Sequence, residues 1–166
     1  MEDAASRFDR FVEARGGELW AAAWLLTGDP HHAEDLVQSA LLKCYPKYPR
    51  FDADRAFEAY VRKAIYRTFI SWWRKRSWRS EVPGEVRDDG AAHTDAVNLT
   101  PELGRALLAL PRAQRAVLVL RYFEDRTAVD TARLLGMPDS TVASHTRRGL
   151  AALRGVDAVA ELRSMP

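Results

Sequence analysis

Apolar residues recur every three or four positions along most of this chain, and no segment alternates strictly between apolar and polar residues. That spacing matches the period of an amphipathic helix, so we predict an all-α fold. The first predicted helix runs from about Ala5 to Leu26. A second begins near Pro30, where Asp29 can cap the helix and Pro30 can occupy its first turn. The Gly16-Gly17 pair interrupts the first apolar stripe and predicts a bend.

The same periodicity predicts the remaining helices. A long one runs from about Ala56 to Ser80, and a short one begins at Thr100-Pro101-Glu102 and ends by Pro111. The segment RAQRAVLVLRYFED predicts the next helix, and a helix-turn-helix pair follows it.

Composition excludes several classes of protein. Apolar residues make up 47% of the chain and charged residues 29%, which is typical of a soluble globular protein. No apolar run approaches the roughly 20 residues needed to span a bilayer, and the acidic start MEDAASRFDR is unlike a signal peptide, so we expect a cytoplasmic protein. Cys44 is the only cysteine, which excludes an internal disulfide.

Charge divides the 166 residues into three segments. Residues 1–80 hold 14 basic and 11 acidic side chains, residues 81–100 hold one and five, and residues 101–166 hold ten and seven. The acidic strip also contains glycine, proline and small residues without an apolar period, as linkers do. We therefore predict two small helical domains, 1–80 and 100–166, joined by a flexible acidic linker at 81–99.

The long helix combines cations with aromatic side chains. Helical geometry places Lys63, Arg67 and Arg74 together on one side, opposite an apolar side that includes Trp72, which we assign to the core. Three aromatic residues lie between the two sides: Tyr66, Phe69 and Trp73. Cations can bind phosphates and aromatic rings can stack on exposed bases. The alternative is that the aromatic residues complete the core and the cations are merely solvated.

The C-terminal segment TAVDTARLLGMPDSTVASHTRRGLAALR has the spacing of a DNA-binding helix-turn-helix. Ala132 is small where two helices would cross, Gly136 can take the left-handed turn, and Val142 can pack beneath the second helix. Asp139 or Ser140 is expected to cap that helix. Its exposed positions would then be Ser140, Thr141, Ser144, His145, Arg147 and Arg148. The two arginines suit phosphates or guanine edges equally well.

Three motifs resemble the sigma-70 family, in the order and spacing of the short extracytoplasmic-function (ECF) sigma factors that keep only regions 2 and 4. AEDLVQSALLKCY is similar to region 2.2, and FDADRAFEAYVRKAIYRTFISWWRKRSW is similar to regions 2.3 and 2.4. ALLALPRAQRAVLVLRYFEDRTAVDTARLLGMPDSTVASHTRRGLAALR is similar to region 4. The run ISWWRKRSWR resembles the actinobacterial SigE-like subgroup. The resemblance covers roughly residues 8 to 154.

This resemblance implies a factor that binds core RNA polymerase, through its β′ coiled coil and β flap, and promoter DNA. An anti-sigma factor is a further partner of many relatives. The implied polymerase contacts are Glu34, Asp35, Gln38, Leu41 and Leu42. Those to a melted minus-10 element, beside a loop at about residues 49–55, are Lys63, Tyr66, Arg67, Trp73 and Arg74. The helix-turn-helix residues above would read the minus-35 element.

The linker has two interpretations. Its five acidic residues could lie in the basic RNA-exit path of polymerase, or the segment could be a plain soluble spacer. These residues are Glu81, Glu85, Asp88, Asp89 and Asp95.

Four positions depart from the family pattern. Ala143 stands where relatives often carry Lys or Arg, His145 stands where they often carry Arg, and Thr146 replaces a common Leu. Arg67 replaces a frequent Asn in the long helix. These changes bear on DNA preference and leave the domain type unaffected. His145 could be read as a pH switch, although a DNA-facing or exposed histidine explains it as well.

No other chemistry is expected. His31 and His32 are neighbours at a helix start and point about 100° apart, which argues against a metal site. No nucleophile, base and orienting residue can be assembled, so we predict no enzyme activity, no cofactor and no small-molecule substrate. Two alternatives to a sigma factor remain: a helix-turn-helix regulator that acts without polymerase, and a sigma-like decoy that holds polymerase or an anti-sigma partner.

Overall fold

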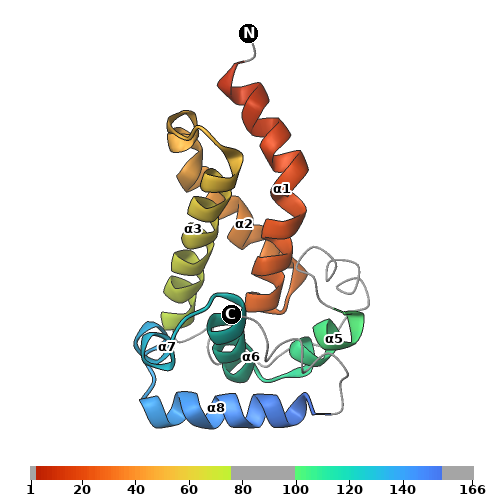
Figure 1. Cartoon of the computed structure of the whole chain (residues 1–166), viewed down its shortest axis with the longest axis vertical. Coiled ribbons are helices and arrows are strands. Elements are labelled where there is room, and N and C mark those ends of the chain that lie inside the picture. The colour runs from red at the N-terminus through yellow and green to blue at the C-terminus, as the bar shows by residue number, and fades with distance from the viewer. Residues whose placement is uncertain (1–2, 76–99, 155–166) are drawn as a thin grey trace.

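The computed structural model describes residues 3–75 and 100–154, which form helices and no strand, so the all-α prediction is confirmed. None of the helices within these two ranges combines the length and apolar character needed to cross a membrane. In chain order (Figure 1) the elements are α1 Ala4–Thr27, α2 Pro30–Cys44, the 3-10 helix η1 Tyr45–Arg50, α3 Asp54–Arg74, α5 Pro101–Ala109, α6 Arg112–Leu118, the π-helical turn η3 Val119–Phe123, α7 Ala128–Leu135 and α8 Asp139–Ala152.

The N-terminal half packs α1, α2 and α3 around an aromatic core. Phe11 and Phe57 meet edge to face with ring centroids 4.9 Å apart, and both are fully buried. Helix α1 continues through Gly16 and Gly17 as one α-helix. Gly28 then ends it in the left-handed conformation, with φ 73°.

Side-chain caps set the starts of α1, α2, α5 and α7. Asp29 accepts hydrogen bonds from the amides of His31 and His32 at the start of α2, with Pro30 in the first turn, as predicted. Thr100 caps α5 and Thr127 caps α7 in the same way.

Two predicted boundaries were wrong. Helix α3 ends at Arg74, because Lys75 has extended backbone angles, and the predicted end at Ser80 lies outside the described residues. At α8 neither Asp139 nor Ser140 is the cap. Pro138 takes the cap position without a side-chain hydrogen bond, which places Asp139 inside the first turn. There its carboxylate still faces the positive end of the helix.

The C-terminal half is built around α6, which packs on α8. The helix-turn-helix forms as predicted: Ala132 and Val142 are buried, and Gly136 turns the chain at φ 67°. Gly149 lets α8 approach α6 closely, because a Cβ there would lie 2.8 Å from a methyl carbon of Leu118. Helix α8 lies across the end of the molecule opposite the N-terminus (Figure 1).

The two halves pack against each other, with α1 against α5 and α6, and α3 against α7. Hydrogen bonds between described residues of the two halves join them. The Arg115 guanidinium donates to the carbonyl of Thr27 at 3.0 Å, and the Trp73 indole N–H donates to the carbonyl of Leu135 at 3.1 Å. We call this pair of hydrogen bonds the closing contact. The predicted linker, 81–99, lies outside the described residues, and the domain limits stay a prediction.

Candidate functional site

The face of α2 that carries the predicted polymerase contacts includes buried and exposed positions. Glu34, Asp35 and Gln38 are exposed. Leu42 is 75% exposed, whereas Leu41 is 9% exposed and packs in the core. Of the two leucines, Leu42 is therefore the one that offers most of its side chain to a partner.

A groove with a volume of about 470 Å³ lies between α1 and α2 beside these residues. Its walls combine aromatic, aliphatic and acidic side chains: Phe8, Asp9, Val12, Glu13, Gln38, Leu41, Leu42 and Tyr45. Tyr45 is 44% exposed and meets Phe8 edge to face at 4.7 Å between centroids. Sequence reasoning missed Tyr45, although its place three residues after Leu42 puts both on one helix face.

A smaller, polar pocket of about 210 Å³ lies between α2 and α3. It is lined by Lys43, Cys44, Tyr60, Ala64, Arg67 and Thr68. The Lys43 ammonium donates to the Thr68 hydroxyl at 3.3 Å, and the Lys47 ammonium lies 5.6 Å from the centroid of the Tyr60 ring. Arg67 is exposed, as are Lys63 and Arg74 on the same helix. The pocket thus brings an aromatic ring and the cations Lys43 and Arg67 together, and Arg67 is the only one of its residues that the sequence predicted as a binding residue.

The aromatic residues of α3 are arranged differently from the prediction. Trp73 is 4% exposed and Tyr66 is 8% exposed, so both are buried in this arrangement. Trp72, assigned to the core, is instead half-buried, with its ring edge-on to that of His32 at 6.3 Å. For Trp73 the C-terminal half contributes, because α7 packs on α3 and the Leu135 carbonyl accepts the Trp73 N–H.

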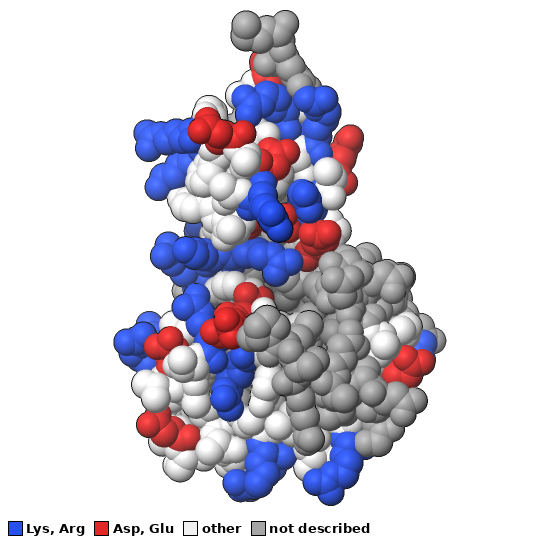
Figure 2. All heavy atoms as spheres, viewed as in Figure 1, with Lys and Arg blue, Asp and Glu red and all other residues white. Residues whose placement is uncertain are grey.

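Helix α8 exposes three of its six predicted DNA-facing positions. Arg147, Arg148 and Ser140 are exposed, whereas Thr141, Ser144 and His145 are half-buried. Figure 2 shows basic side chains along the edge of the molecule formed by α8.

His145 is half-buried on this surface. Partial burial and the nearby Arg148 lower the pKa of its imidazole. Its buried Nδ1 atom has no hydrogen-bond partner among the described residues. The neighbouring Thr146 is buried and donates to the Val142 carbonyl, so a hydroxyl is accommodated where relatives often carry Leu.

Comparison with known proteins identifies the family to which this chain belongs. Residues 11–79 match the family model described as Sigma-70 region 2, and residues 101–153 match Sigma-70, region 4. The RNA polymerase sigma-E factor of Streptomyces avermitilis is 36% identical over 153 residues, which cover 89% of this chain and 83% of the relative. The chain belongs to the sigma-70 family.

Within that family the chain is an ECF sigma factor. The RNA polymerase sigma-E factor of Streptomyces coelicolor is 34% identical over 152 residues, covering 89% of this chain and 84% of the relative. The ECF RNA polymerase sigma factor SigW of Bacillus subtilis is 26% identical over 162 residues, covering 89% and 87%. The solved structure of the sigma factor RpoE with the anti-sigma factor NepR from Bartonella quintana is 22% identical, with a TM-score of 0.47 and coverage of 95% and 96%.

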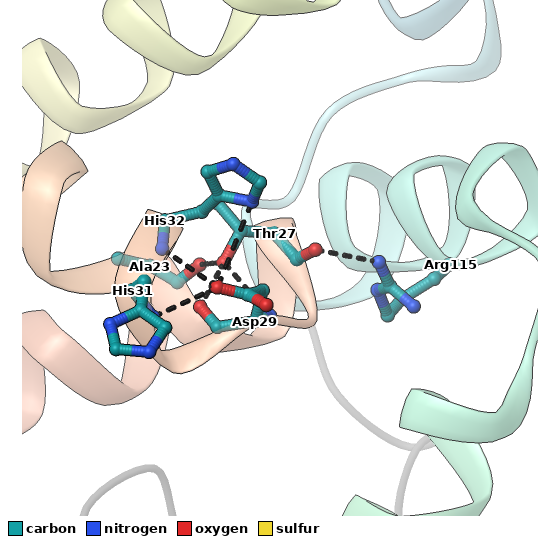
Figure 3. Close-up of polar contacts among 6 residues, drawn as sticks. All are labelled: Ala23, Thr27, Asp29, His31, His32 and Arg115. Atoms are coloured by element: carbon teal, nitrogen blue, oxygen red, sulfur yellow. Dashed lines mark hydrogen bonds and ion pairs between the residues drawn. The ribbon is translucent and has the colours of Figure 1, made fainter. Parts of the chain in front are cut away.

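Region 2 and region 4 of this sigma factor meet at the corner between α1 and α2 (Figure 3). The Thr27 hydroxyl donates to the Ala23 carbonyl at 2.9 Å, while the Thr27 carbonyl accepts from Arg115. Burial would raise the pKa of Asp29, but the amides of His31 and His32 donate to its carboxylate and lower the pKa overall. The corner is a structural junction: among the described residues no group of three His, Cys, Asp or Glu side chains could hold a metal ion.

Proposed function

We propose that this sigma factor binds core RNA polymerase, directs it to promoters with minus-10 and minus-35 elements, and captures the melted strand. The observation that carries the proposal is the presence of both sigma regions in one chain, each with an exposed surface suited to its partner.

For polymerase, the surface is α2 together with the groove beside it. The exposed Leu42 and Tyr45 supply apolar area, and acidic side chains surround them: Asp9, Glu13, Glu34 and Asp35. Such a surface suits a partner helix that presents apolar side chains flanked by Lys or Arg. This supports the β′ coiled coil as the partner of α2.

For the minus-10 element, the polar pocket on α3 is the surface available in this arrangement. A nucleobase could stack on Tyr60 while Lys43 and Arg67 neutralise the adjoining phosphates. Lys63 and Arg74 extend the positive charge along the exposed side of α3. Tyr66 and Trp73 are both buried here, and Trp73 can take part only if its hydrogen bond to the Leu135 carbonyl breaks.

For the minus-35 element, α8 would enter the major groove. Arg147 and Arg148 would contact phosphates or guanine edges, and Ser140 would lie at the helix start near the backbone. Three half-buried residues of the same helix would contact the DNA only where the duplex lies close to the helix surface: Thr141, Ser144 and His145.

The remaining proposals concern partners and chemistry. Promoter opening needs binding energy and no covalent step, so we propose no enzyme activity, cofactor or small-molecule substrate for this chain. A cytoplasmic location follows from the need to meet polymerase and DNA. An anti-sigma factor is a further proposed partner, and no residue identifies it.

Run-off transcription with purified core RNA polymerase on a genomic fragment library tests the function. Discrete transcript starts that share two spaced upstream motifs are expected. Tight polymerase binding without transcripts would instead indicate a decoy. Specific duplex binding without polymerase binding would indicate a regulator that acts alone.

A further inference from the structure

Tyr48 attaches the 3-10 helix η1, which connects α2 to α3, to the aromatic core. Its side chain is 2% exposed, whereas the other residues of η1 are exposed. Its ring meets those of Phe57 and Phe8 edge to face, with centroids 4.8 Å and 5.5 Å apart. The Arg7 guanidinium of α1 lies 5.4 Å from the same ring centroid. Helix η1 is therefore held to the core through this one side chain.

The Tyr48 hydroxyl lies where η1, α1 and α3 meet. It donates to the Asp54 carboxylate at 3.0 Å, and the Arg7 carbonyl is a second acceptor at 3.3 Å. Burial, and then Asp54, raise the pKa of this hydroxyl, so it keeps its proton and acts as the donor. Asp54 is the first residue of α3, and Ala53 before it gives that helix no side-chain cap. The hydroxyl thus ties η1 to a helix start that no cap residue defines.

Phe51 connects this tie to the polar pocket between α2 and α3. Its amide donates to the Tyr48 carbonyl at 3.0 Å, and its ring packs on those of Phe57 and Tyr60, each at 5.3 Å between centroids. Because Phe51 lies between Tyr48 and Asp54 in the chain, the hydrogen bond that joins these two residues closes a short loop around it. Tyr60 is the aromatic residue that lines the pocket. The position of its ring therefore depends on how the loop is held.

We propose that Tyr48 is a positioning residue for single-strand capture: its hydroxyl holds the loop at residues 49–53 in one arrangement, so that Phe51 supports the Tyr60 ring where a nucleobase stacks. Tyr48 itself does not touch DNA, because its side chain is buried. A preformed site binds more tightly than one that must first be ordered. The DNA part of this inference rests on the proposed function.

Single-atom changes separate the hydroxyl from the ring. Tyr48→Phe removes the donor and keeps the ring in the core. Asp54→Ala removes the acceptor, whereas Asp54→Asn removes the same charge but keeps an oxygen that can accept the hydrogen bond. Tyr122→Phe on η3 is the control for Tyr48→Phe, since the Tyr122 hydroxyl makes no hydrogen bond to another described residue.

The first measurement is amide hydrogen exchange of the full chain. Exchange at residues 49–54 should be faster in Tyr48→Phe and Asp54→Ala than in the wild type, Asp54→Asn and Tyr122→Phe. Combining Tyr48→Phe with Asp54→Ala should add little, because both remove one interaction. Unchanged exchange at the loop in Tyr48→Phe would overturn the proposal. Equal acceleration in all helices would also overturn it, because the hydroxyl would then only stabilise the fold.

The second measurement is the fluorescence anisotropy of a labelled short single-stranded oligonucleotide of mixed sequence, with the corresponding duplex in parallel. If the loop keeps its arrangement for about a fifth of the time without the hydroxyl, Tyr48→Phe should bind the single strand about fivefold more weakly. Duplex binding should be unchanged, and Asp54→Ala should bind the single strand more weakly than Asp54→Asn.

Two results of the binding experiment would contradict the inference at different points. Faster loop exchange with unchanged single-strand binding would overturn the role of Tyr48 in capture. A wild-type chain that binds no single strand would overturn the proposed capture step itself, and with it this role, whereas the exchange experiment would still decide whether the hydroxyl holds the loop. Neither measurement uses polymerase or a promoter, so a failed transcription assay is a separate outcome.

Discussion

Leu41 and Leu42 are adjacent in sequence and should respond to substitution in opposite ways. Leu42→Ala should leave the free energy of unfolding nearly unchanged and weaken polymerase binding about tenfold, because an exposed apolar side chain of an interface is lost. Leu41→Ala should cost about 2–4 kcal/mol of stability, because it leaves a cavity in the core. Urea denaturation and a polymerase binding assay measure the two effects. Normal binding by folded Leu42→Ala would remove this leucine from the interface.

Glu124 should make stability depend on pH. Burial raises the pKa of its carboxyl from 4.5 to about 8, against the opposing effect of Arg62 and Arg126. Between those two values the folded chain holds a proton that the unfolded chain has released, so stability should fall as the pH rises through this window.

Glu124→Gln should remove that fall and make the chain more stable at alkaline pH than the wild type. The exposed neighbour Asp125 supplies the control, since Asp125→Asn removes a charge without removing a buried carboxyl. Urea midpoints measured from about pH 5 to about pH 9 would show the difference. An unchanged slope in Glu124→Gln would assign the pH dependence to other groups.

At the scale of single residues, the sequence indicated which side chains suit a binding or packing role, but it was less accurate about which aromatic side chains are buried. Arg67 and Leu42 are exposed as a binding role requires, and Ala132 and Val142 are buried as the helix-turn-helix requires. Trp73 is buried more deeply than Trp72, which is half-buried and packs against the core. The helical angle was measured from one core, whereas α7 provides a second packing surface on α3.

At the scale of helices, α8 should account for duplex binding. Arg147→Ala and Arg148→Ala should each weaken promoter binding and reduce the salt dependence of the binding constant by about one counterion, if the residue contacts a phosphate. Arg105→Ala on α5 is the control, since it removes an exposed arginine elsewhere in the same half. Titration of a duplex at several salt concentrations measures both quantities. An unchanged slope with a changed base preference would indicate contact with a guanine edge.

Some helix boundaries were predicted from a cap residue. Asp29 and Thr100 start helices and Gly136 ends one, because each satisfies backbone groups or a backbone angle that few residues can. Asp3 and Thr127 cap α1 and α7 in the same way, but these caps were not predicted. The end of α3 has no such residue. The π-helical turn η3 likewise has no distinctive sequence, since it arises from hydrogen bonds such as that from Glu124 N–H to the Val119 carbonyl.

At the scale of the molecule, the association of the two halves was beyond prediction. Both acceptors of the closing contact are main-chain carbonyls, which every residue possesses and which leave no trace in the sequence. Of the two donors, Trp73 was predicted to contact the minus-10 element, and the sequence suggested no role for Arg115. The polar pocket likewise depends on Lys43 and Tyr60 from separate helices, which no spacing rule relates.

Because the acceptors of the closing contact are main-chain carbonyls, only some mutations can separate the two halves. A genetic selection for variants in which the two halves are separated should recover changes at Arg115, Trp73 and Gly28. The first two residues supply the donor side chains, and Gly28 leaves the space that the Arg115 guanidinium occupies. Conservative changes at Leu135 should be absent from such a collection, since any residue there still offers the same oxygen. Deep sequencing of the selected pool would reveal this asymmetry. Mutation can remove the side-chain donors, whereas the main-chain acceptors are present whichever residue occupies the position.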